Sequence, residues 1–238
     1  MRIVYGEWSW YYADMNVLKN FAVLEGGDGT GTSTQIKMLN RRFEEHGSDS
    51  SAAPLPPLFT TCEPTGNPIG RVIRSCLKGE TVFRPETLAR LFAADRGEHL
   101  YGPDGIVERA GRGEFVVSDR YSPSSLVYQG IACGNDLSRL LNEAFPLPEL
   151  IIILDLDPHI AVERIRHREK KEIFEYLEFQ IRVRRTYLDL IPYYRERGAR
   201  VELVDARESA ETVSLAVWNF IREMPIFQER RGESTDET

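Results

Sequence analysis

The chain has few cysteines and no long apolar run, and these two absences narrow what it can be. Its 238 residues include only three cysteines, Cys62, Cys76 and Cys133, which are widely spaced and match no zinc-binding pattern. The longest uninterrupted apolar stretch is Leu150–Leu154, which is far too short to cross a membrane. No basic segment followed by an apolar one opens the chain, so we expect no signal peptide and a cytoplasmic protein with reduced thiols.

Positive charge is also scarce. Lysine and arginine total 30 residues against 37 aspartates and glutamates, which gives a net charge of −7 and argues against a general nucleic-acid-binding protein. A nucleotide pocket remains compatible with this charge, because a few local donors can hold a phosphate inside an acidic protein. Apolar residues make up 42% of the chain, enough for a packed core. We therefore expect small-molecule partners, and neither nucleic acid nor a membrane.

Two terminal segments differ in composition from the rest of the chain. Residues 1–18 contain several aromatic side chains without a clear period, and we expect them to be an N-terminal extension. Residues 226–238 are mostly polar and are predicted to be a largely disordered tail. Between them, residues 19–225 are predicted to form one domain.

Within this domain, short apolar stretches alternate with amphipathic helical patterns. The predicted strands are Phe21–Glu25, Leu58–Thr61, Glu114–Ser118, Leu150–Asp155 and Val201–Val204. The predicted helices are Thr32–His46 with Gly47 as its C-terminal cap, one beginning at Pro85, and Pro158–Arg168, Glu175–Arg197 and Glu208–Arg222. This alternation predicts a three-layer α/β fold with about five parallel strands covered by helices on both faces. Ligands bind at the carboxyl ends of the strands in such folds.

A glycine-rich segment, GGDGTGTSTQ, lies between the first predicted strand and the first helix. It matches the phosphate-binding pattern G-x-x-x-x-G-K-[ST] except that Thr32 replaces the lysine. The backbone N–H groups of such a loop hold phosphates, and the Ser33 hydroxyl would bind Mg²⁺. The alternative is a simple glycine-rich turn with a Ser or Thr cap. The residues predicted to bind ATP are Gly26, Gly27, Asp28, Gly29, Thr30, Gly31, Thr32, Ser33 and Thr34.

Loss of the lysine removes the cation that normally spans the β- and γ-phosphates. A basic run that includes Arg166 and Arg168 follows the helix after strand 150–155, and it could supply a replacement from a lid over about residues 166–175. The alternative is a solvated helix end whose cations complement the helix dipole.

Several ordered motifs over residues 20–222 together resemble the thymidylate (dTMP) kinase family. The Glu-Pro-Thr triplet and the compact FEYLEF segment look most like archaeal or archaeal-type bacterial members. The resemblance implies the P-loop nucleoside-monophosphate kinase fold, a homodimer, and transfer of the γ-phosphoryl group of MgATP to dTMP. The motifs are FAVLEGGDGTGTSTQ (21–35), CEPTGNPIGRVIR (62–74), LFAADRGEH (91–99), SDRYSPSSLVYQG (118–130), LPELIIILDLDPHIAVERI (147–165) and FEYLEFQIRVRRTYLDL (174–190).

The resemblance assigns catalytic and metal-binding roles. Arg120 would bind the dTMP phosphate, a task suited to a planar bidentate donor. Asp119 would lie near Mg²⁺ or orient Arg120, while Asp28 and Ser33 would organise the metal and the phosphates. A surface ion pair at the end of a strand is the alternative explanation of the Asp119–Arg120 pair.

The resemblance also assigns the nucleoside pocket. Phe92 would lie on the thymine ring and Arg96 would reach its O4 atom, and their spacing of four residues puts both on one helix face. Without the family, Phe92 would be interpreted as a core residue. The remaining predicted contacts are Ser124 and Ser125 at the base edge, Tyr128 beside the sugar, and Glu63 at the phosphate site.

The chain departs from the family pattern at positions 62 and 173 as well as at Thr32, and the loss of cations at positions 32 and 173 leaves the activity open. Many relatives have arginine before the Glu-Pro pair, whereas this chain has Cys62, so Arg71 and Arg74 become candidate replacement donors. Ile173 stands where many relatives have a lid arginine, which leaves Arg166 and Arg168 as the catalytic candidates. The rival hypotheses are a nucleotide-binding paralogue with weak or no catalysis, and a kinase for another nucleoside monophosphate.

Overall fold

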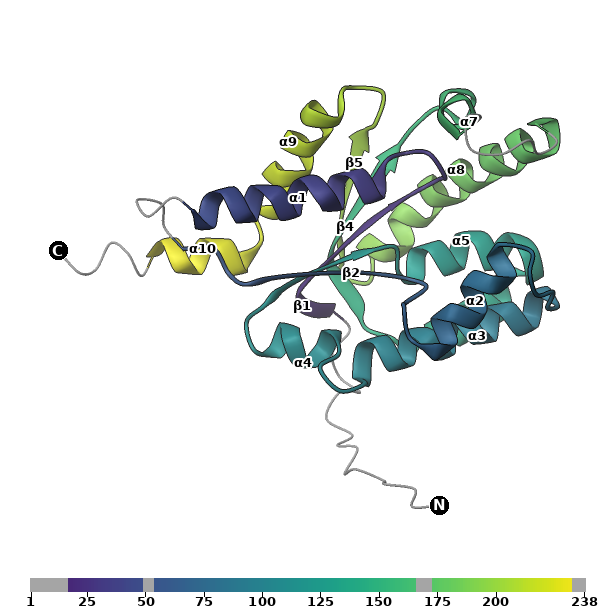
Figure 1. Cartoon of the computed structure of the whole chain (residues 1–238), viewed down its shortest axis with the longest axis horizontal. Helices are drawn as coiled ribbons and strands as arrows, with labels where there is room; N and C mark the ends of the chain where they lie inside the picture. The colour runs from purple at the N-terminus through teal and green to yellow at the C-terminus, as the bar shows by residue number, and fades with distance from the viewer. Residues whose placement is uncertain (1–16, 49–53, 166–172, 233–238) are drawn as a thin grey trace, which may run out of the picture.

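A computed structural model describes residues 17–48, 54–165 and 173–232. Five strands form one sheet in the order β2-β3-β1-β4-β5, and every neighbouring pair is parallel. The all-parallel sheet between two layers of helices confirms the predicted three-layer α/β fold (Figure 1). The strands are β1 (Val17–Gly26), β2 (Leu58–Cys62), β3 (Phe115–Asp119), β4 (Leu147–Asp155) and β5 (Arg200–Asp205).

Helices connect the strands and flank the sheet. None of those described is long and apolar enough to cross a membrane. They are α1 (Thr32–Gly47), α2 (Pro68–Leu77), α3 (Pro85–Tyr101), α4 (Ile106–Gly111), α5 (Ser122–Cys133), α6 (Asn135–Asn142), α7 (Pro158–Ile165), α8 (Ile173–Arg195), α9 (Ala210–Ile221) and α10 (Pro225–Gly232).

The core consists of two apolar clusters, one on each face of the sheet. Successive side chains of a strand point to opposite faces, so Phe21 and Val23 of β1 belong to one cluster and Ala22 and Leu24 to the other. Helices α3, α4, α5 and α8 pack on the first face, and α1, α9 and α10 pack on the second. Burial of β1 on both faces explains why its residues 21–24 form an uninterrupted apolar run.

Several element ends differ from the prediction by a few residues, and three differences concern a cap or a segment boundary. Gly47 is not a left-handed cap: it lies in the last turn of α1, and Ser48 follows with right-handed backbone angles, so no glycine is needed there. The predicted polar tail begins as helix α10, because Ile226 and Phe227 are buried in the second core cluster. The sheet also begins before the predicted domain boundary, because Leu18 of β1 is buried in the first cluster.

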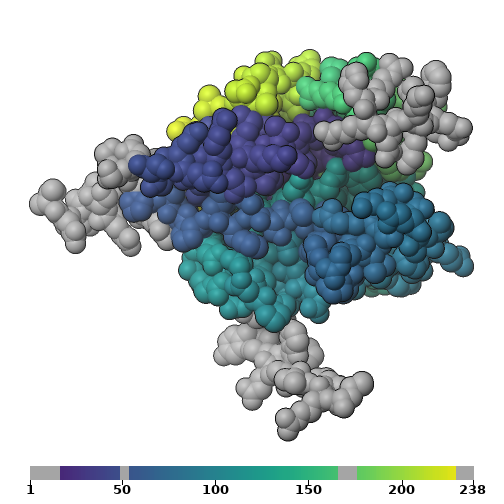
Figure 2. Space-filling view, viewed as in Figure 1, coloured from purple at the N-terminus to yellow at the C-terminus, as the bar shows by residue number. Residues whose placement is uncertain are grey.

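The strand order places the glycine-rich loop at the centre of the carboxyl edge. β1 is the middle strand, and Asp119 at the end of β3 pairs in register with Leu24 on one side and Cys62 on the other. The residues that follow these three strands therefore meet at one edge, as predicted. Figure 2 shows α1 in the upper part of this view and the segment of α2 and α3 at the lower right.

Candidate active site

The glycine-rich loop has a backbone that only glycine adopts readily. Gly29 and Gly31 have φ angles of 83° and 99°, in the left-handed region. A Cβ atom on Gly29 would lie 2.7 Å from the Ala161 carbonyl oxygen of α7, so the loop packs tightly against that helix. No described side chain caps the N-terminus of α1 at Gly31, which leaves the first N–H groups of the helix for a ligand. These features fit the predicted phosphate cradle.

Thr32, the residue in place of lysine, begins α1 and is 7% exposed. Its hydroxyl can donate one hydrogen bond but carries no charge. Arg166 and Arg168, the predicted replacement cations, lie outside the described residues. Ile165, which immediately precedes that segment, lies against the loop, because a Cβ atom on Gly29 would approach its side chain to 3.0 Å.

Ser33 and Asp119 form the pair that was predicted to bind Mg²⁺. The Ser33 hydroxyl donates to Oδ2 of Asp119 at 2.5 Å, and Oδ1 of Asp119 is buried without a hydrogen-bond partner in the described part of the chain. A buried carboxylate oxygen beside a hydroxyl suits a hard cation. The described residues contain no cluster of three or more His, Cys, Asp or Glu side chains for a metal ion. Mg²⁺ binds few protein groups and takes its other ligands from water and phosphate, so the Ser33 hydroxyl and the Asp119 carboxylate fit this ion.

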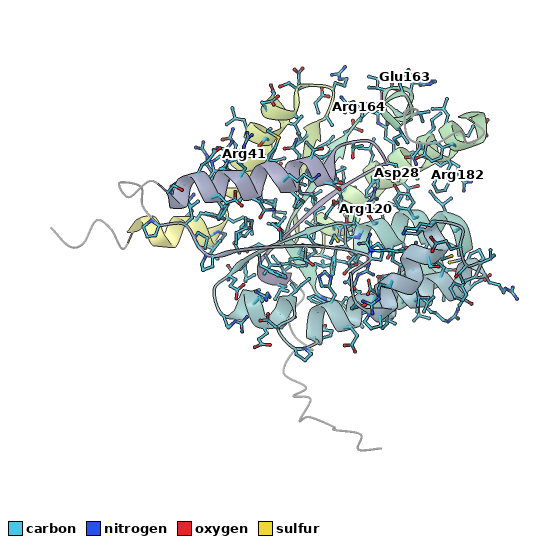
Figure 3. The ribbon with its side chains drawn as sticks, in the orientation of Figure 1. Asp28, Arg41, Arg120, Glu163, Arg164 and Arg182 are labelled. Atoms are coloured by element: carbon cyan, nitrogen blue, oxygen red, sulfur yellow. The ribbon has the colours of Figure 1, made fainter. Side chains whose placement is uncertain are left out.

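Asp28 of the loop accepts hydrogen bonds from two helices. Its Oδ1 accepts from Arg120 at 2.9 Å and from the Tyr128 hydroxyl at 3.1 Å, and both donors lie at or on α5. Its Oδ2 accepts from Tyr176 and from Gln180 of α8, each at 3.0 Å. Figure 3 shows Asp28 and Arg120 close together at the carboxyl edge of the sheet. Asp28 is thus the carboxylate that contacts the predicted phosphate-binding arginine.

The backbone of Arg120 is held in an uncommon conformation. Its φ angle is 74°, which lies in the left-handed region and is rare for a residue with a side chain. Its N–H donates to the Leu24 carbonyl at 3.0 Å, and the Ser118 hydroxyl donates to its carbonyl at 2.7 Å. These contacts from β1 and β3 direct the guanidinium toward Asp28.

Glu25 is a buried carboxyl that the sequence analysis did not assign to the site. It is fully buried and accepts from the Tyr121 N–H at 2.8 Å, the Ser124 hydroxyl at 2.6 Å and the Tyr187 hydroxyl at 2.9 Å. Burial raises the pKa of Glu25 to about 7, even though these hydrogen bonds and the nearby Arg120 favour its charged form. An acidic residue at the end of an otherwise apolar strand was the signal that could have identified it.

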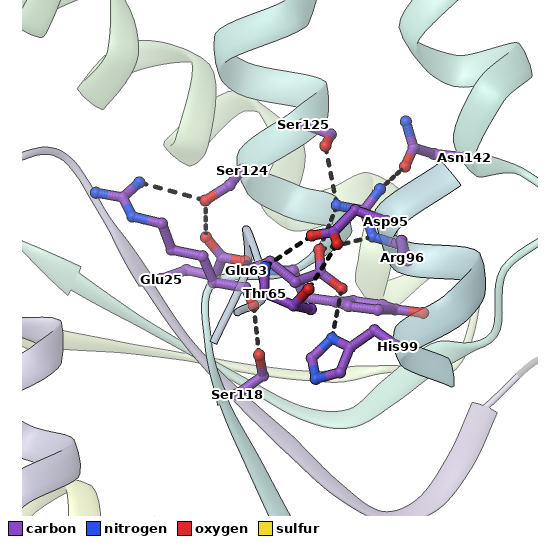
Figure 4. A network of polar contacts seen from close by, with 12 residues as sticks. Glu25, Glu63, Thr65, Asp95, Arg96, His99, Ser118, Ser124, Ser125 and Asn142 are labelled. Atoms are coloured by element: carbon purple, nitrogen blue, oxygen red, sulfur yellow. Dashed lines mark hydrogen bonds and ion pairs between the residues drawn. The ribbon is translucent and has the colours of Figure 1, made fainter. Parts of the chain in front are cut away.

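Arg96 lies at the buried end of the site and is 1% exposed. Its Nε and Nη2 donate to Oε2 of Glu63 at 3.0 and 2.7 Å, and Nη2 also donates to the Ser125 hydroxyl at 2.9 Å. Nη1 donates to the Asn142 side chain (Figure 4). A guanidinium has five N–H donors, so these contacts leave one Nη1 hydrogen for a ligand.

The segment after β2 is held by α3. The Glu63–Pro64 peptide bond is cis, and Oε1 of Glu63 lies 3.1 Å from Nδ1 of His99. Asp95 accepts from the backbone N–H and the hydroxyl of Thr65 at 2.7 and 2.6 Å (Figure 4). These buried contacts position the Glu-Pro-Thr triplet beside the carboxyl end of β3.

Arg74 and Arg71, the two candidate replacements for an arginine at position 62, lie differently. Arg74 reaches the Cys62 sulfur and the Pro64 carbonyl from α2, and it lines the cavity described below. Arg71 donates to the Gly66 carbonyl and is exposed. The structure therefore favours Arg74 as the donor near Cys62.

A cavity of about 640 Å³ joins these groups at the carboxyl edge. It brings together residues that are far apart in the chain, including all those predicted for the acceptor nucleotide. Its lining also includes residues that were not predicted, such as Gln129, next to Tyr128 on α5, and Phe179 of α8. The predicted residues in the lining are Asp28, Ser33, Glu63, Arg74, Phe92, Arg96, Asp119, Arg120, Ser124, Ser125 and Tyr128.

Comparison with known proteins agrees with this geometry. The family model described as thymidylate kinase matches residues 24–217. A protein of Treponema pallidum named as a thymidylate kinase is 40% identical over 212 residues, which is 88% of this chain and 98% of that protein. A similarly named protein of the archaeon Pyrobaculum aerophilum is 39% identical over 87% of this chain and 99% of that protein. Another, from Thermococcus kodakarensis, is 37% identical over 81% of this chain and 92% of that protein.

Proposed function

Because this chain belongs to the thymidylate kinase family, we propose that it transfers the γ-phosphoryl group of ATP to dTMP and forms dTDP and ADP. The observation that carries the proposal is the cavity in which the phosphate loop faces the predicted nucleotide-binding side chains. All three cysteines are free thiols, which supports a reducing compartment, the cytoplasm.

On the donor side, the loop from Gly26 to Thr34 holds the ATP phosphates. The uncapped N-terminus of α1 and the left-handed glycines supply N–H donors where the phosphates carry negative charge. Ser33 and Asp119 would hold Mg²⁺, which when bound would neutralise phosphate charge. Arg166 and Arg168 are proposed to supply the positive charge that Thr32 lacks.

On the acceptor side, Arg120 binds the dTMP phosphate, and Glu63 and Arg74, which line the same cavity, are proposed to lie near that phosphate. Phe92 packs on the thymine ring, and the one remaining N–H of Arg96 donates to a carbonyl oxygen of the base. Ser125 is already an acceptor for Arg96, so its own hydroxyl hydrogen is available for the ligand.

The remaining acceptor-side residues are Tyr128, proposed to lie beside the sugar, and Ser124, proposed to lie at the base edge with Ser125. Tyr128 and Ser124 face the cavity from α5, next to Arg120 and Asp28. Tyr128 fills space beside the sugar and disfavours a 2′-hydroxyl. Its hydroxyl remains a donor at neutral pH, because burial raises the pKa of Tyr128 well above its ordinary value.

The chemical step needs positioning more than covalent participation by the protein. An ionised oxygen of the dTMP phosphate attacks the γ-phosphorus, and the bond from that phosphorus to the β–γ bridging oxygen breaks, so ADP leaves. No general base is required, because the attacking oxygen carries no proton. The protein's contribution is alignment by Arg120 and neutralisation of charge by the loop amides and the cations.

One observation favours a second candidate function. Thr32 is buried and uncharged where the family has a lysine, so a nucleotide-binding protein with weak or no catalysis would keep the same cavity. A non-catalytic protein, a kinase for a different monophosphate and a dTMP kinase would differ in the acceptors with which they release ADP.

A coupled assay of ADP release with dTMP, dUMP, dCMP and AMP as acceptors separates the three candidates. We expect turnover with dTMP and little with AMP. Binding of dTMP without turnover would establish the non-catalytic candidate, and equal turnover with AMP would contradict the assignment of the base pocket.

We also propose a homodimer, as the family resemblance implies. The α2 region exposes Val72 and Val82, which are apolar side chains outside the acceptor cavity that a partner chain would cover. Light scattering after size exclusion measures the mass directly. A monomer at micromolar concentration would contradict this proposal without affecting the proposed activity.

A further inference from the structure

Gln180 on α8 makes an unusual contact with the phosphate loop. Its side chain is almost completely buried, with the residue 2% exposed. The amide oxygen accepts from the Asp28 backbone N–H at 3.2 Å, and the amide nitrogen donates to Oδ2 of Asp28 at 3.0 Å. A Cβ atom on Gly27 would lie 3.0 Å from the amide oxygen, so the glycine allows this close approach. The oxygen and the nitrogen of the buried Gln180 amide thus both form hydrogen bonds with Asp28.

Further hydrogen bonds to the Asp28 carboxylate fix its orientation. Tyr176, one helical turn before Gln180 on α8, donates to the same Oδ2. Burial and the negative charge of Asp28 raise the pKa of Tyr176, so its hydroxyl stays protonated and remains a donor. Arg120 and Tyr128 occupy Oδ1, so each carboxylate oxygen has two donors and the plane of the carboxylate is fixed.

We propose that Gln180 is a positioning residue for phosphoryl transfer: it holds the Asp28 carboxylate so that this carboxylate orients Arg120 toward the acceptor phosphate. The inference rests on the proposed kinase function. Gln180 does not line the acceptor cavity, whereas Asp28 and Arg120 do, so Gln180 acts through Asp28. The contact also joins α8 to the loop across 152 residues of sequence.

The variant Gln180→Glu distinguishes a positioning role of Gln180 from a role in packing alone. A protonated carboxyl can accept from the Asp28 N–H and donate to Oδ2, as the amide does, whereas an ionised one presents a negative charge to Asp28. The activity of Gln180→Glu should therefore recover as the pH falls. Among the described residues, the charged and titratable groups around this position are Asp28, Arg120, Tyr128 and Tyr176, with Glu25 and Tyr187 behind them, and the Asp155–Arg184 ion pair, which lines a small cavity together with Gln180. All variants contain these groups. Dividing the activity of each variant by that of wild type at the same pH therefore cancels the effect of their titration.

The experiment measures kcat and KM for dTMP and ATP from about pH 5.5 to 8.5 in wild type, Gln180→Glu and Gln180→Met. At pH 8 we expect both variants to lose at least about tenfold in kcat/KM for dTMP, which corresponds to about 1.4 kcal/mol of transition-state stabilisation. The KM for ATP should change less than about threefold, because the Asp28 carboxylate lines the acceptor cavity, whereas ATP is proposed to bind the backbone N–H groups of the loop. The ratio of Gln180→Glu to wild type should rise at low pH, and the ratio for Gln180→Met should stay flat.

Gln35→Glu is the matched control. Gln35 is a second buried glutamine, 3% exposed, and its amide nitrogen donates to the Ala210 carbonyl, away from Asp28. This variant should lose thermal stability yet keep kcat/KM for dTMP at every pH at which it is folded. Circular dichroism verifies that each variant is folded. If Gln180→Glu does not fold, the kinetics of Gln180→Met alone test the positioning role of Gln180.

Wild-type kcat/KM in Gln180→Met, or a pH-independent ratio in folded Gln180→Glu, would overturn the proposal. If wild type itself shows no turnover, the kinase function fails, and dTMP calorimetry on the same variants decides the positioning role separately. At least about fivefold weaker dTMP binding in Gln180→Met would then support it, and unchanged binding would overturn it.

Discussion

Nη2 of Arg74 lies 3.3 Å from the sulfur of Cys62, so a guanidinium from α2 reaches the end of β2 where many family members have an arginine in the strand itself. The same guanidinium donates to the Pro64 and Thr65 carbonyls, which orients it at the border of the acceptor cavity. Its Nη1 has no partner among the described residues and can bind an anion. We propose that Arg74, 12 positions after Cys62, replaces the donor that is missing at Cys62.

Arg74→Ala should weaken dTMP binding by about 1–3 kcal/mol, the range for losing a hydrogen bond to a charged group. Arg120→Ala should have an effect in the same range, because Arg120 is the other proposed phosphate donor. Arg71→Ala is the matched control, since Arg71 lies on the same helix but donates to Gly66 outside the cavity. Calorimetry measures all three variants. Equal losses in Arg71→Ala and Arg74→Ala would show that general charge, and not a specific contact, is responsible.

Glu25 should make the free energy of unfolding depend on pH. Its pKa is raised from the ordinary value of 4.5 to about 7 in the folded protein, so between these values the folded state binds more protons than the unfolded state. The Glu25 contribution is therefore complete below about pH 4.5 and is lost as the pH rises through about 7. The loss amounts to about 3 kcal/mol, the equivalent of this rise in pKa at about 1.4 kcal/mol per unit.

The side chain of a Glu25→Gln variant cannot titrate, and its amide can donate to the hydroxyls of Ser124 and Tyr187 while accepting from the Tyr121 N–H. Urea unfolding of both proteins from about pH 5 to 8 checks the prediction. The stability of wild type relative to Glu25→Gln should fall across this range. A constant difference would mean that Glu25 keeps an ordinary pKa in the folded protein.

Thr32→Lys should raise the rate constant of phosphoryl transfer at least about tenfold, because preorganised positive charge at this position can contribute several kcal/mol to the transition state. The affinity for dTMP should change little, since the lysine serves the donor side. Rapid-quench kinetics with saturating dTMP measure the step directly.

An unchanged rate in Thr32→Lys, with wild type already at about 1–100 per second, would show that another cation has the role of the lysine. Arg166→Ala and Arg168→Ala would then identify it. If both wild type and Thr32→Lys bind dTMP but show no turnover, the non-catalytic candidate is correct.

A chain that begins at Met15 should fold and bind nucleotide as the full chain does. It retains all of β1, which starts at Val17, including the pairs of Val17 with Leu147 and of Leu18 with Pro148. A chain that begins at Asn20 is the control, because it loses both pairs and the buried Leu18 side chain. The melting temperature should fall by several degrees only in the second protein. A similar fall in the first would show that residues 1–14 contribute to stability.

The local elements of this protein could be predicted from its sequence because their signals are local. A buried strand is a short apolar run, as in Leu150–Asp155, and the loop after β1 has glycines where left-handed angles occur. The errors were local too. Gly47 suggested a cap that the helix does not use, and the polar end of the chain concealed the buried Phe227. The spacing of Phe92 and Arg96 placed both at the cavity, as expected for one helix face.

The partners of the site residues depended on tertiary structure. Asp28 meets Tyr176 and Gln180 across 148 and 152 residues, and no periodicity in either segment indicates that contact. The sequence did not distinguish Arg71 from Arg74 as the replacement donor. Their different positions on α2 give them different partners, Gly66 for Arg71 and Cys62 for Arg74. Glu25 has its raised pKa because two helices cover it. Strand and helix patterns follow from backbone geometry over a few residues, whereas the contacts of a buried polar group depend on how distant elements pack, which is a property of the whole fold.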